Sequence, residues 1–180
     1  FVPLNAQVVT DYADMIPGAV ETVAACRARG LKIGSTTGYT REIMANLTPV
    51  AAAAGYAPDN LVCAGDLAAG RPTPLMMYRT FLDLGVFPAH AVVKVDDTEP
   101  GIAEGLAAGT WTVGVAVSGN AMGLSREEVA ALAPAEFAAR RDAATATLVR
   151  AGAHVVIDSV ADLLPVLDEI EGRLMRGERP

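Results

Sequence analysis

Short apolar runs rich in β-branched residues alternate with longer helix-like segments along the whole chain. This alternation is typical of α/β proteins, in which helices connect the strands of a parallel sheet. The runs are apolar throughout, as expected of strands that helices cover on both faces. We therefore predict an α/β fold with a parallel sheet. The predicted strands are residues 31–36, 60–63, 91–95, 112–115 and 154–157.

Residues with strong positional preferences mark the ends of the predicted helices. Glycine favours the position just after a helix, whereas serine, threonine and proline favour its start. The predicted boundaries are Gly30 after the first helix, Thr40 before a helix that runs to about Ala54, Thr73 and Pro74 before the next, Pro100 and Gly109 around a short helix, the capping box of Ser125 and Glu128, and Ser159 before the last helix.

Length and composition favour a single globular domain that spans residues 1–180. Of the 180 residues, 52% are hydrophobic and 19% are charged, so the chain can bury a core of its own. The net charge of −7 argues against a nucleic-acid partner, because phosphate backbones are bound by clustered Lys and Arg. We expect no membrane span and no signal peptide. Cys26 and Cys63 are predicted to be buried free thiols, which fits a cytoplasmic protein.

Hydroxyl side chains and a glycine follow the first predicted strand. In open α/β sheets, ligands bind beyond the carboxyl ends of the strands, so these residues are candidates for a site. Ser35, Thr36, Thr37 and Gly38 lead into a helix N-terminus, where N–H groups and the helix dipole favour an anion. The alternative is an ordinary Ser/Thr-rich turn that only caps the helix.

An arginine follows the second predicted strand. Arg71 lies between a glycine and a proline, in a loop that enters a helix. A guanidinium held in such a loop can neutralise a phosphoryl group. The alternative is a solvated surface arginine.

Two adjacent carboxylates follow the third predicted strand. Asp96 and Asp97 lead directly into a helix, and carboxylate oxygens suit a hard divalent cation. The alternative is a helix N-terminus, where acidic residues and Thr98 are favoured without any metal. Taken together, a hydroxyl loop, an arginine and a carboxylate pair at one edge of the sheet indicate phosphoryl chemistry with magnesium.

Four segments of the sequence resemble the motifs of phosphonoacetaldehyde hydrolases, a family of the haloacid dehalogenase superfamily. Residues 30–41, Gly-Leu-Lys-Ile-Gly-Ser-Thr-Thr-Gly-Tyr-Thr-Arg, resemble the second motif. Residues 69–76, Ala-Gly-Arg-Pro-Thr-Pro-Leu-Met, resemble the third motif, in which arginine replaces the lysine of other members. Residues 94–98 and 105–114 resemble the fourth motif and the strand after it. The similarity extends from about Ile16 to Ile170.

The resemblance implies a three-layer Rossmann-like core and a role for each candidate residue. Thr37 would hydrogen-bond the phosphoryl oxygens with help from its neighbours, and Arg71 would balance the charge of the transferring group. Asp97 would bind Mg²⁺, and Tyr39 would lie near the substrate. The family hydrolyses phosphonoacetaldehyde to acetaldehyde and phosphate during the use of 2-aminoethylphosphonate. A lysine of a helical cap forms a Schiff base with this small phosphonate, an aspartate takes up the phosphoryl group, and the enzyme tends to be a homodimer.

The sequence departs from the family pattern in three respects. The nucleophile loop, Asp-x-Ala-Gly-Thr, does not occur in the 180 residues, and neither does the cap with its lysine. Lys32 and Lys94 are predicted to lie in strands and are not assigned that role. Many relatives have a second aspartate four residues after the magnesium ligand, where this chain has Gly101. Either Asp96 compensates as a second ligand or water completes the metal shell.

We therefore interpret residues 1–180 as a partial catalytic core without the first strand and the cap. That strand is central in the family, so its absence would leave two inner edges unpaired, and the chain alone is expected to be inactive. One alternative is another phosphatase or a phosphoglucomutase of the superfamily, although those usually have lysine where Arg71 stands. A second alternative, from another class, is a non-catalytic phosphate-binding α/β module.

Overall fold

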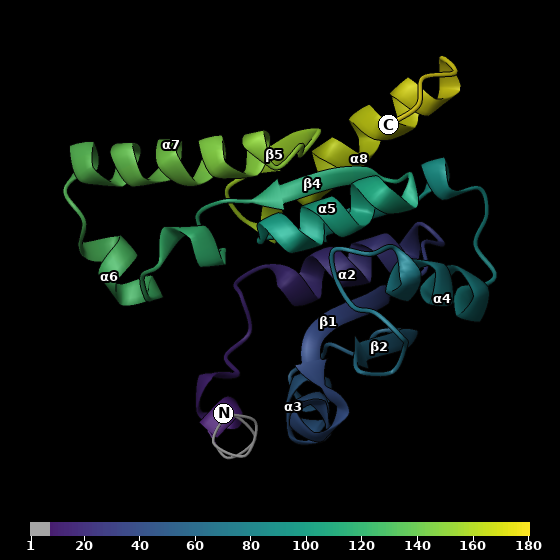
Figure 1. Cartoon of the computed structure of the whole chain (residues 1–180). Coiled ribbons are helices and arrows are strands. Elements are labelled where there is room, and N and C mark those ends of the chain that lie inside the picture. The colour runs from purple at the N-terminus through teal and green to yellow at the C-terminus, as the bar shows by residue number, and fades with distance from the viewer. Residues whose placement is uncertain (1–7) are drawn as a thin grey trace. The chain divides into compact units, whose positions relative to one another are not determined.

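The computed structural model describes residues 8–180, which form two compact units (Figure 1). The N-terminal unit is Phe1–Val86 and the C-terminal unit is Phe87–Pro180. Both consist of parallel strands connected by helices. The α/β class predicted from the sequence is thus confirmed, whereas the single domain over residues 1–180 stays a prediction.

The N-terminal unit contains one pair of parallel strands. Gly34 lies opposite Asn60, and the register continues to Thr37 opposite Cys63 before it shifts. Helix α4 packs on both strands, and a β-carbon at Gly34 would lie 2.4 Å from Cγ2 of Thr80 on that helix. The elements of this unit are η1 (Val9–Tyr12), α2 (Ala19–Ala28), β1 (Gly34–Thr40), α3 (Arg41–Ala53), β2 (Asn60–Ala64) and α4 (Leu75–Leu84).

Strand β1 begins later and extends further than predicted. The apolar residues at 31–33 suggested a strand over 31–36, but pairing with β2 starts at Gly34. The carboxylate of Asp59 accepts the backbone N–H of Ile33 at 2.8 Å. The Asp59 side chain thus accepts the hydrogen bond that the N–H of Ile33 would otherwise donate to a neighbouring strand. The register shift between Thr37 and Thr40 allows β1 to continue to the start of α3.

The C-terminal unit contains three parallel strands in the order β3–β4–β5. Two α-helices, α6 and α7, and the 3-10 helix η3 occupy the long connection between β4 and β5. The elements of this unit are η2 (Ala89–Ala91), β3 (Val93–Asp96), α5 (Glu99–Ala108), β4 (Trp111–Val115), η3 (Asn120–Met122), α6 (Arg126–Ala131), α7 (Pro134–Arg150), β5 (Val155–Ile157), η4 (Val160–Asp162) and α8 (Leu163–Met175).

The three-layer arrangement that the family resemblance implies is present in the C-terminal unit. Trp111, Val113 and Val115 face one side of the sheet and form a buried core with residues of α8. The alternate positions face α5 and α7, because successive side chains of a strand point to opposite faces. Gly114, for example, approaches Leu148 of α7 so closely that a β-carbon would lie 3.0 Å from its Cβ atom. Helices therefore cover both faces of this sheet.

Most predicted helix boundaries are confirmed. Gly30 follows α2 with a φ of 79°, Gly109 ends α5, and Ser125 forms its capping box with Glu128. Thr40 precedes α3 as expected, but its side chain makes no capping hydrogen bond. The remaining three boundaries differ by one to three residues, and α5 begins at Glu99 instead of Pro100. Pro74 caps α4 while the Thr73 hydroxyl donates to the carbonyl of Gly70, and Ser159 caps the short helix η4 ahead of α8.

Within the described residues, β4 has a paired strand on both sides, and the other four strands each pair with one neighbour. Strand β1 pairs with β2 alone, and β3 pairs with β4 alone.

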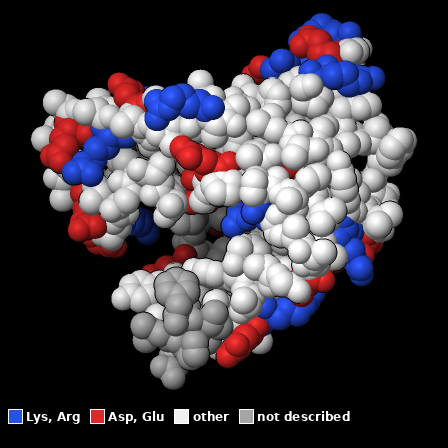
Figure 2. All heavy atoms as spheres, in the orientation of Figure 1, with Lys and Arg blue, Asp and Glu red and all other residues white. Residues whose placement is uncertain are grey.

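Charged side chains of both signs lie side by side over α7 and the end of α8, on the face shown in Figure 2. Ion pairs account for this pattern, as between Glu136 and Arg140 at 3.2 Å and between Arg173 and Glu178 at 3.0 Å. Within residues 8–180, no helix combines the length and the apolar character that crossing a bilayer requires.

A half-buried histidine, His154, links β4 to the start of β5 and should make stability depend on pH. Nδ1 of His154 accepts the backbone N–H of Thr112 at 3.0 Å, a role that only the unprotonated nitrogen can fill. Burial, and secondarily the positive charge of Arg173, lower the pKa of His154 below its ordinary value. The unfolded chain therefore takes up a proton first as the pH falls through about 6.5. The stability from neutral His154 is complete above that pH and is lost below it.

As the pH is lowered from 7 to 5, we expect the melting temperature to fall more steeply in the unsubstituted protein (the parent) than in the His154→Asn variant. Asparagine keeps an acceptor for Thr112 but does not titrate. Calorimetric melting at several pH values tests this, with His90→Asn as the matched control. Parallel pH curves for the parent and His154→Asn would contradict the expectation.

Candidate active site

The second and third predicted motifs lie side by side in the N-terminal unit. A β-carbon at Gly38 would lie 2.8 Å from Nη2 of Arg71, so the guanidinium rests against the glycine backbone at the end of β1. The loop after β2 therefore brings Arg71 back to the segment that contains Thr37 and Tyr39. Any side chain at position 38 would displace the guanidinium.

The hydroxyl residues of β1 have different environments. Oγ1 of Thr37 accepts the backbone N–H of Tyr39 at 3.1 Å, which leaves the hydroxyl hydrogen to be donated elsewhere. Ser35 instead hydrogen-bonds the phenol of Tyr56, whose pKa is raised by burial. Thr36 is half-buried, and Tyr39 has 42% of its surface exposed. Thr37 therefore belongs to the segment that contacts Arg71, and its binding of an anion stays a prediction.

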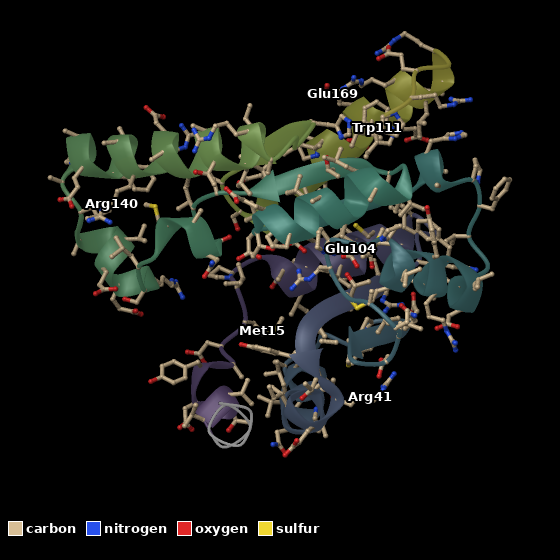
Figure 3. All side chains as sticks on the ribbon, in the orientation of Figure 1. Met15, Arg41, Glu104, Trp111, Arg140 and Glu169 are labelled. Atoms are coloured by element: carbon tan, nitrogen blue, oxygen red, sulfur yellow. The ribbon has the colours of Figure 1, made fainter. Side chains whose placement is uncertain are left out.

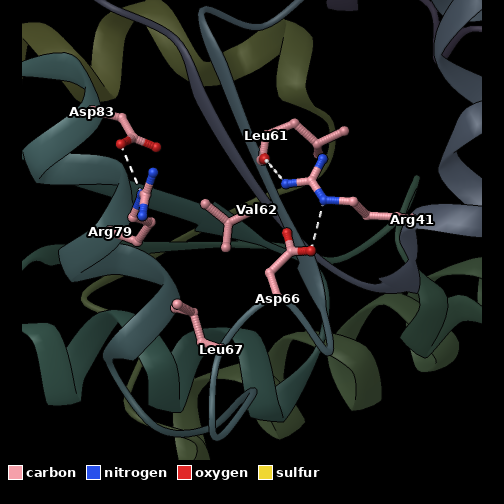
Figure 4. A pocket seen from close by; sticks show the side chains of 7 residues that line it. All are labelled: Arg41, Leu61, Val62, Asp66, Leu67, Arg79 and Asp83. Carbon is pink, nitrogen blue, oxygen red and sulfur yellow. Dashed lines mark hydrogen bonds and ion pairs between the residues drawn. The ribbon is translucent and has the colours of Figure 1, made fainter.

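A hollow of about 200 Å³ lies beside β2, and its lining contains none of the predicted site residues (Figure 4). Each arginine in it is matched by a carboxylate: Arg41 pairs with Asp66 at 2.7 Å and Arg79 with Asp83 at 2.8 Å. Asp66 also accepts the backbone N–H of Cys63 at 2.7 Å, a role that was not predicted. The hollow is therefore better explained by the packing of α3 and α4 beside β2 than by substrate binding. Its lining consists of Arg41, Leu61, Val62, Asp66, Leu67, Arg79 and Asp83.

Asp97 lies at the end of β3 in the C-terminal unit and is held by the loop after β4. Its Oδ2 atom accepts the backbone N–H of Asn120 at 2.7 Å. A β-carbon at Gly119 would lie 2.7 Å from Cβ of Asp97 and 2.2 Å from the carbonyl oxygen of Val115. This loop thus fits closely against the carboxylate only because residue 119 is glycine.

Asp96 belongs to a buried charge cluster. Its Oδ1 atom accepts the backbone N–H of Thr98 at 3.0 Å and the Thr98 hydroxyl at 2.7 Å. Its Oδ2 atom lies 3.1 Å from Nζ of Lys94, which also lies 2.9 Å from Oε2 of Glu104. Glu104 projects from α5 and is fully buried (Figure 3). No role was predicted for Glu104, and a charged residue among the small apolar residues of α5 was the available signal.

Asp97 is the predicted residue whose chemistry fits a magnesium ion. Among residues 8–180, no three His, Cys, Asp or Glu side chains are grouped as a complete metal site. Asp97 offers the hard oxygen ligand that Mg²⁺ prefers, whereas both oxygens of Asp96 already have partners. The described residues therefore fit a contribution of one carboxylate to such a site.

The structure brings together some of the predicted site residues. Gly38 and Arg71 meet in the N-terminal unit, and Asp96 and Asp97 lie together in the C-terminal unit. The convergence of all three loops on one sheet edge stays a prediction.

Comparison with known proteins assigns the chain to a class. The haloacid dehalogenase-like hydrolase model matches residues 3–109, and the parallel strands with helices on both faces agree with that class. The chain is 59% identical over 180 residues to the phosphonoacetaldehyde hydrolase of Paraburkholderia xenovorans and 52% identical over 181 residues to that of Klebsiella pneumoniae. It therefore belongs to the phosphonoacetaldehyde hydrolase family.

A solved structure supports the same assignment. The phosphonoacetaldehyde hydrolase-like protein of Oleispira antarctica superposes on the whole chain with a TM-score of 0.98 and 45% sequence identity. The alignment covers 65% of that protein and 67% of the two curated relatives. The chain thus spans about two thirds of the length of these proteins.

Proposed function

We propose that this chain supplies phosphoryl- and magnesium-binding residues to an enzyme that cleaves the P–C bond of phosphonoacetaldehyde. The products are acetaldehyde and phosphate. The main support is the 59% identity to the Paraburkholderia enzyme over the entire chain. The contact between Gly38 and Arg71 is a second line of support, because it brings together two motifs that would both have to contact one phosphoryl group.

Thr37 and Arg71 form the phosphoryl-binding part of the proposed site. The N–H of Tyr39 is occupied by Oγ1 of Thr37, so it is the Thr37 hydroxyl hydrogen that points to the phosphoryl oxygens. The Arg71 guanidinium offers several donors in one plane and balances negative charge as the phosphoryl group transfers. Ser35, Thr36 and Gly38 shape this loop, and Tyr39 borders the substrate.

Asp97 is the proposed magnesium ligand, oriented by the N–H of Asn120. The ion, when bound, would offset the negative charge that builds up around the phosphoryl group. A cytoplasmic location, a small phosphonate as the partner and a homodimeric assembly complete the proposal.

The nucleophilic aspartate and the Schiff-base lysine are proposed to lie outside these 180 residues. The sequence has two lysines, and both have structural partners. Nζ of Lys32 donates to the carbonyl of Leu84, and Nζ of Lys94 is enclosed by Asp96 and Glu104. Neither is available to attack an aldehyde without loss of these contacts.

Acetaldehyde formation from phosphonoacetaldehyde tests the proposal. The complete gene product and the 180-residue chain are assayed side by side, with and without Mg²⁺. We expect magnesium-dependent turnover by the complete gene product and none by the 180 residues alone. A folded, magnesium-loaded gene product that releases no acetaldehyde would rule out the substrate, and phosphate release from sugar phosphates would then favour a different phosphatase.

A further inference from the structure

The Asp96 carboxylate occupies the space in which a side chain at position 101 would begin. A β-carbon on Gly101 would lie 1.9 Å from Cγ of Asp96 and 2.1 Å from each of its oxygens. Non-bonded atoms do not approach so closely, and protein interiors are packed too tightly to absorb the overlap. Asp96 in its present position and a side chain at position 101 therefore exclude each other.

The Asp96 carboxylate is held in this space from two directions. Thr98 donates both its N–H and its hydroxyl to Oδ1, and the Thr98 hydroxyl oxygen in turn accepts the N–H of Gly101 at 3.2 Å. Lys94 holds Oδ2 from the sheet side. Rotating Asp96 away would break these interactions in an environment where its side chain is only 9% exposed.

The Asp96 carboxylate already has a cation beside it, the Lys94 ammonium. The Lys94 ammonium lies 3.1 Å from Oδ2 and is 8% exposed, so it is poorly screened by water. A divalent ion at the same carboxylate oxygen would have to displace that ammonium, which Glu104 also holds at 2.9 Å. Asp97, the next residue, is held instead by a neutral donor, the N–H of Asn120.

We propose that Asp96 is a positioning residue and not a magnesium ligand. It fixes the turn between β3 and α5 that presents Asp97, and it fills the space at Gly101 where many relatives have their second aspartate. Lys94 and Glu104 hold Asp96 in place. The inference rests on the proposed function only where it concerns magnesium, because the mutual exclusion of Asp96 and a residue-101 side chain is steric.

The steric part is tested by a double-mutant cycle without magnesium. In the complete gene product, Gly101→Ala is expected to lower the melting temperature by roughly 5–10 °C, although alanine is favoured over glycine in helices. In an Asp96→Gly background the same change should leave the melting temperature unchanged or raise it. The matched control is Gly172→Ala in α8, where the nearest atom to a new β-carbon is 3.5 Å away. Equal effects of Gly101→Ala in both backgrounds would overturn the mutual exclusion.

The positioning part is tested by calorimetric titration of the folded gene product with Mg²⁺. Asp97→Asn should abolish binding. Asp96→Asn keeps an oxygen for Thr98 and should change the Kd by about threefold or less, whereas Asp96→Ala should weaken binding roughly 10–100-fold, as loss of a supporting group does.

Two results would overturn the positioning role. Loss of binding in Asp96→Asn as complete as in Asp97→Asn would make Asp96 a ligand, and an unchanged Kd in Asp96→Ala would leave it a purely structural residue. A parent protein that binds no Mg²⁺ would contradict the proposed function and the positioning of Asp97, while the melting cycle would still decide the steric part.

Discussion

Arg71→Ala is expected to lower kcat/KM for phosphonoacetaldehyde by about 10²–10³-fold, the usual effect of removing one donor aimed at developing charge. The guanidinium lies against the backbone of Gly38, beside the Thr37 hydroxyl that we assign to the phosphoryl oxygens. Because Arg71 belongs to a loop outside the core, its removal should affect activity far more than the melting temperature. Acetaldehyde release by the complete gene product is the measurement.

Two further variants separate the proposed role of Arg71 from a general effect of charge. Arg71→Lys keeps a positive charge but loses the planar set of donors, so its activity should lie between those of the parent and Arg71→Ala. Arg79→Ala removes an exposed arginine whose partner is Asp83 and should retain activity within about twofold, since such surface pairs contribute little. If Arg79→Ala were as inactive as Arg71→Ala, the hollow beside β2 would be the better candidate for the substrate site.

Lys94→Met is expected to destabilise the protein by about 3–5 kcal/mol, as removal of one partner from a buried ion pair does. Without its ammonium, the carboxylates of Asp96 and Glu104 would face each other's charge in a region that water hardly reaches. Chemical denaturation of the complete gene product measures the loss, and the melting temperature should fall by roughly 10 °C.

Adding Glu104→Gln to Lys94→Met should recover part of this stability, because it removes one of the two unpaired charges. Arg140→Met is the matched control, because Arg140 forms an exposed ion pair with Glu136 at 3.2 Å. A loss in Lys94→Met no larger than in Arg140→Met would show that the buried charges are not coupled as the distances indicate.

The parts of the fold that depend on local sequence could be predicted. The capping box at Ser125 and the helix end at Gly109 follow from preferences within one turn of the chain. The start of β1 could not be predicted, because it depends on Asp59, which takes the N–H of Ile33 from 26 residues away. Strand ends are set by pairing partners, and a single sequence does not contain that information directly.

The same distinction between local sequence and distant partners applies to the candidate site. The sequence indicated Arg71, Thr37 and Asp97 because their residue types and neighbours form recognisable motifs, and their catalytic roles stay predictions. The family resemblance raised Asp96 as a ligand that compensates for Gly101, but only the three-dimensional turn shows that the Asp96 carboxylate occupies the space of a residue-101 side chain. Glu104 was missed for a similar reason, because its partner Lys94 lies on a different element.

The single tryptophan of the chain offers a way to observe one unit alone. Trp111 is fully buried in the C-terminal unit, with the Arg173 guanidinium 4.3 Å from its ring centre. The four tyrosines, Tyr12, Tyr39, Tyr56 and Tyr78, all lie in the N-terminal unit. Tryptophan emission should therefore shift to longer wavelength when residues 87–180 unfold, whereas near-ultraviolet tyrosine signals report on the other unit. Superimposable denaturation curves from the two chromophores would mean that both units unfold as one cooperative body, and separate curves would give each its own free energy of unfolding.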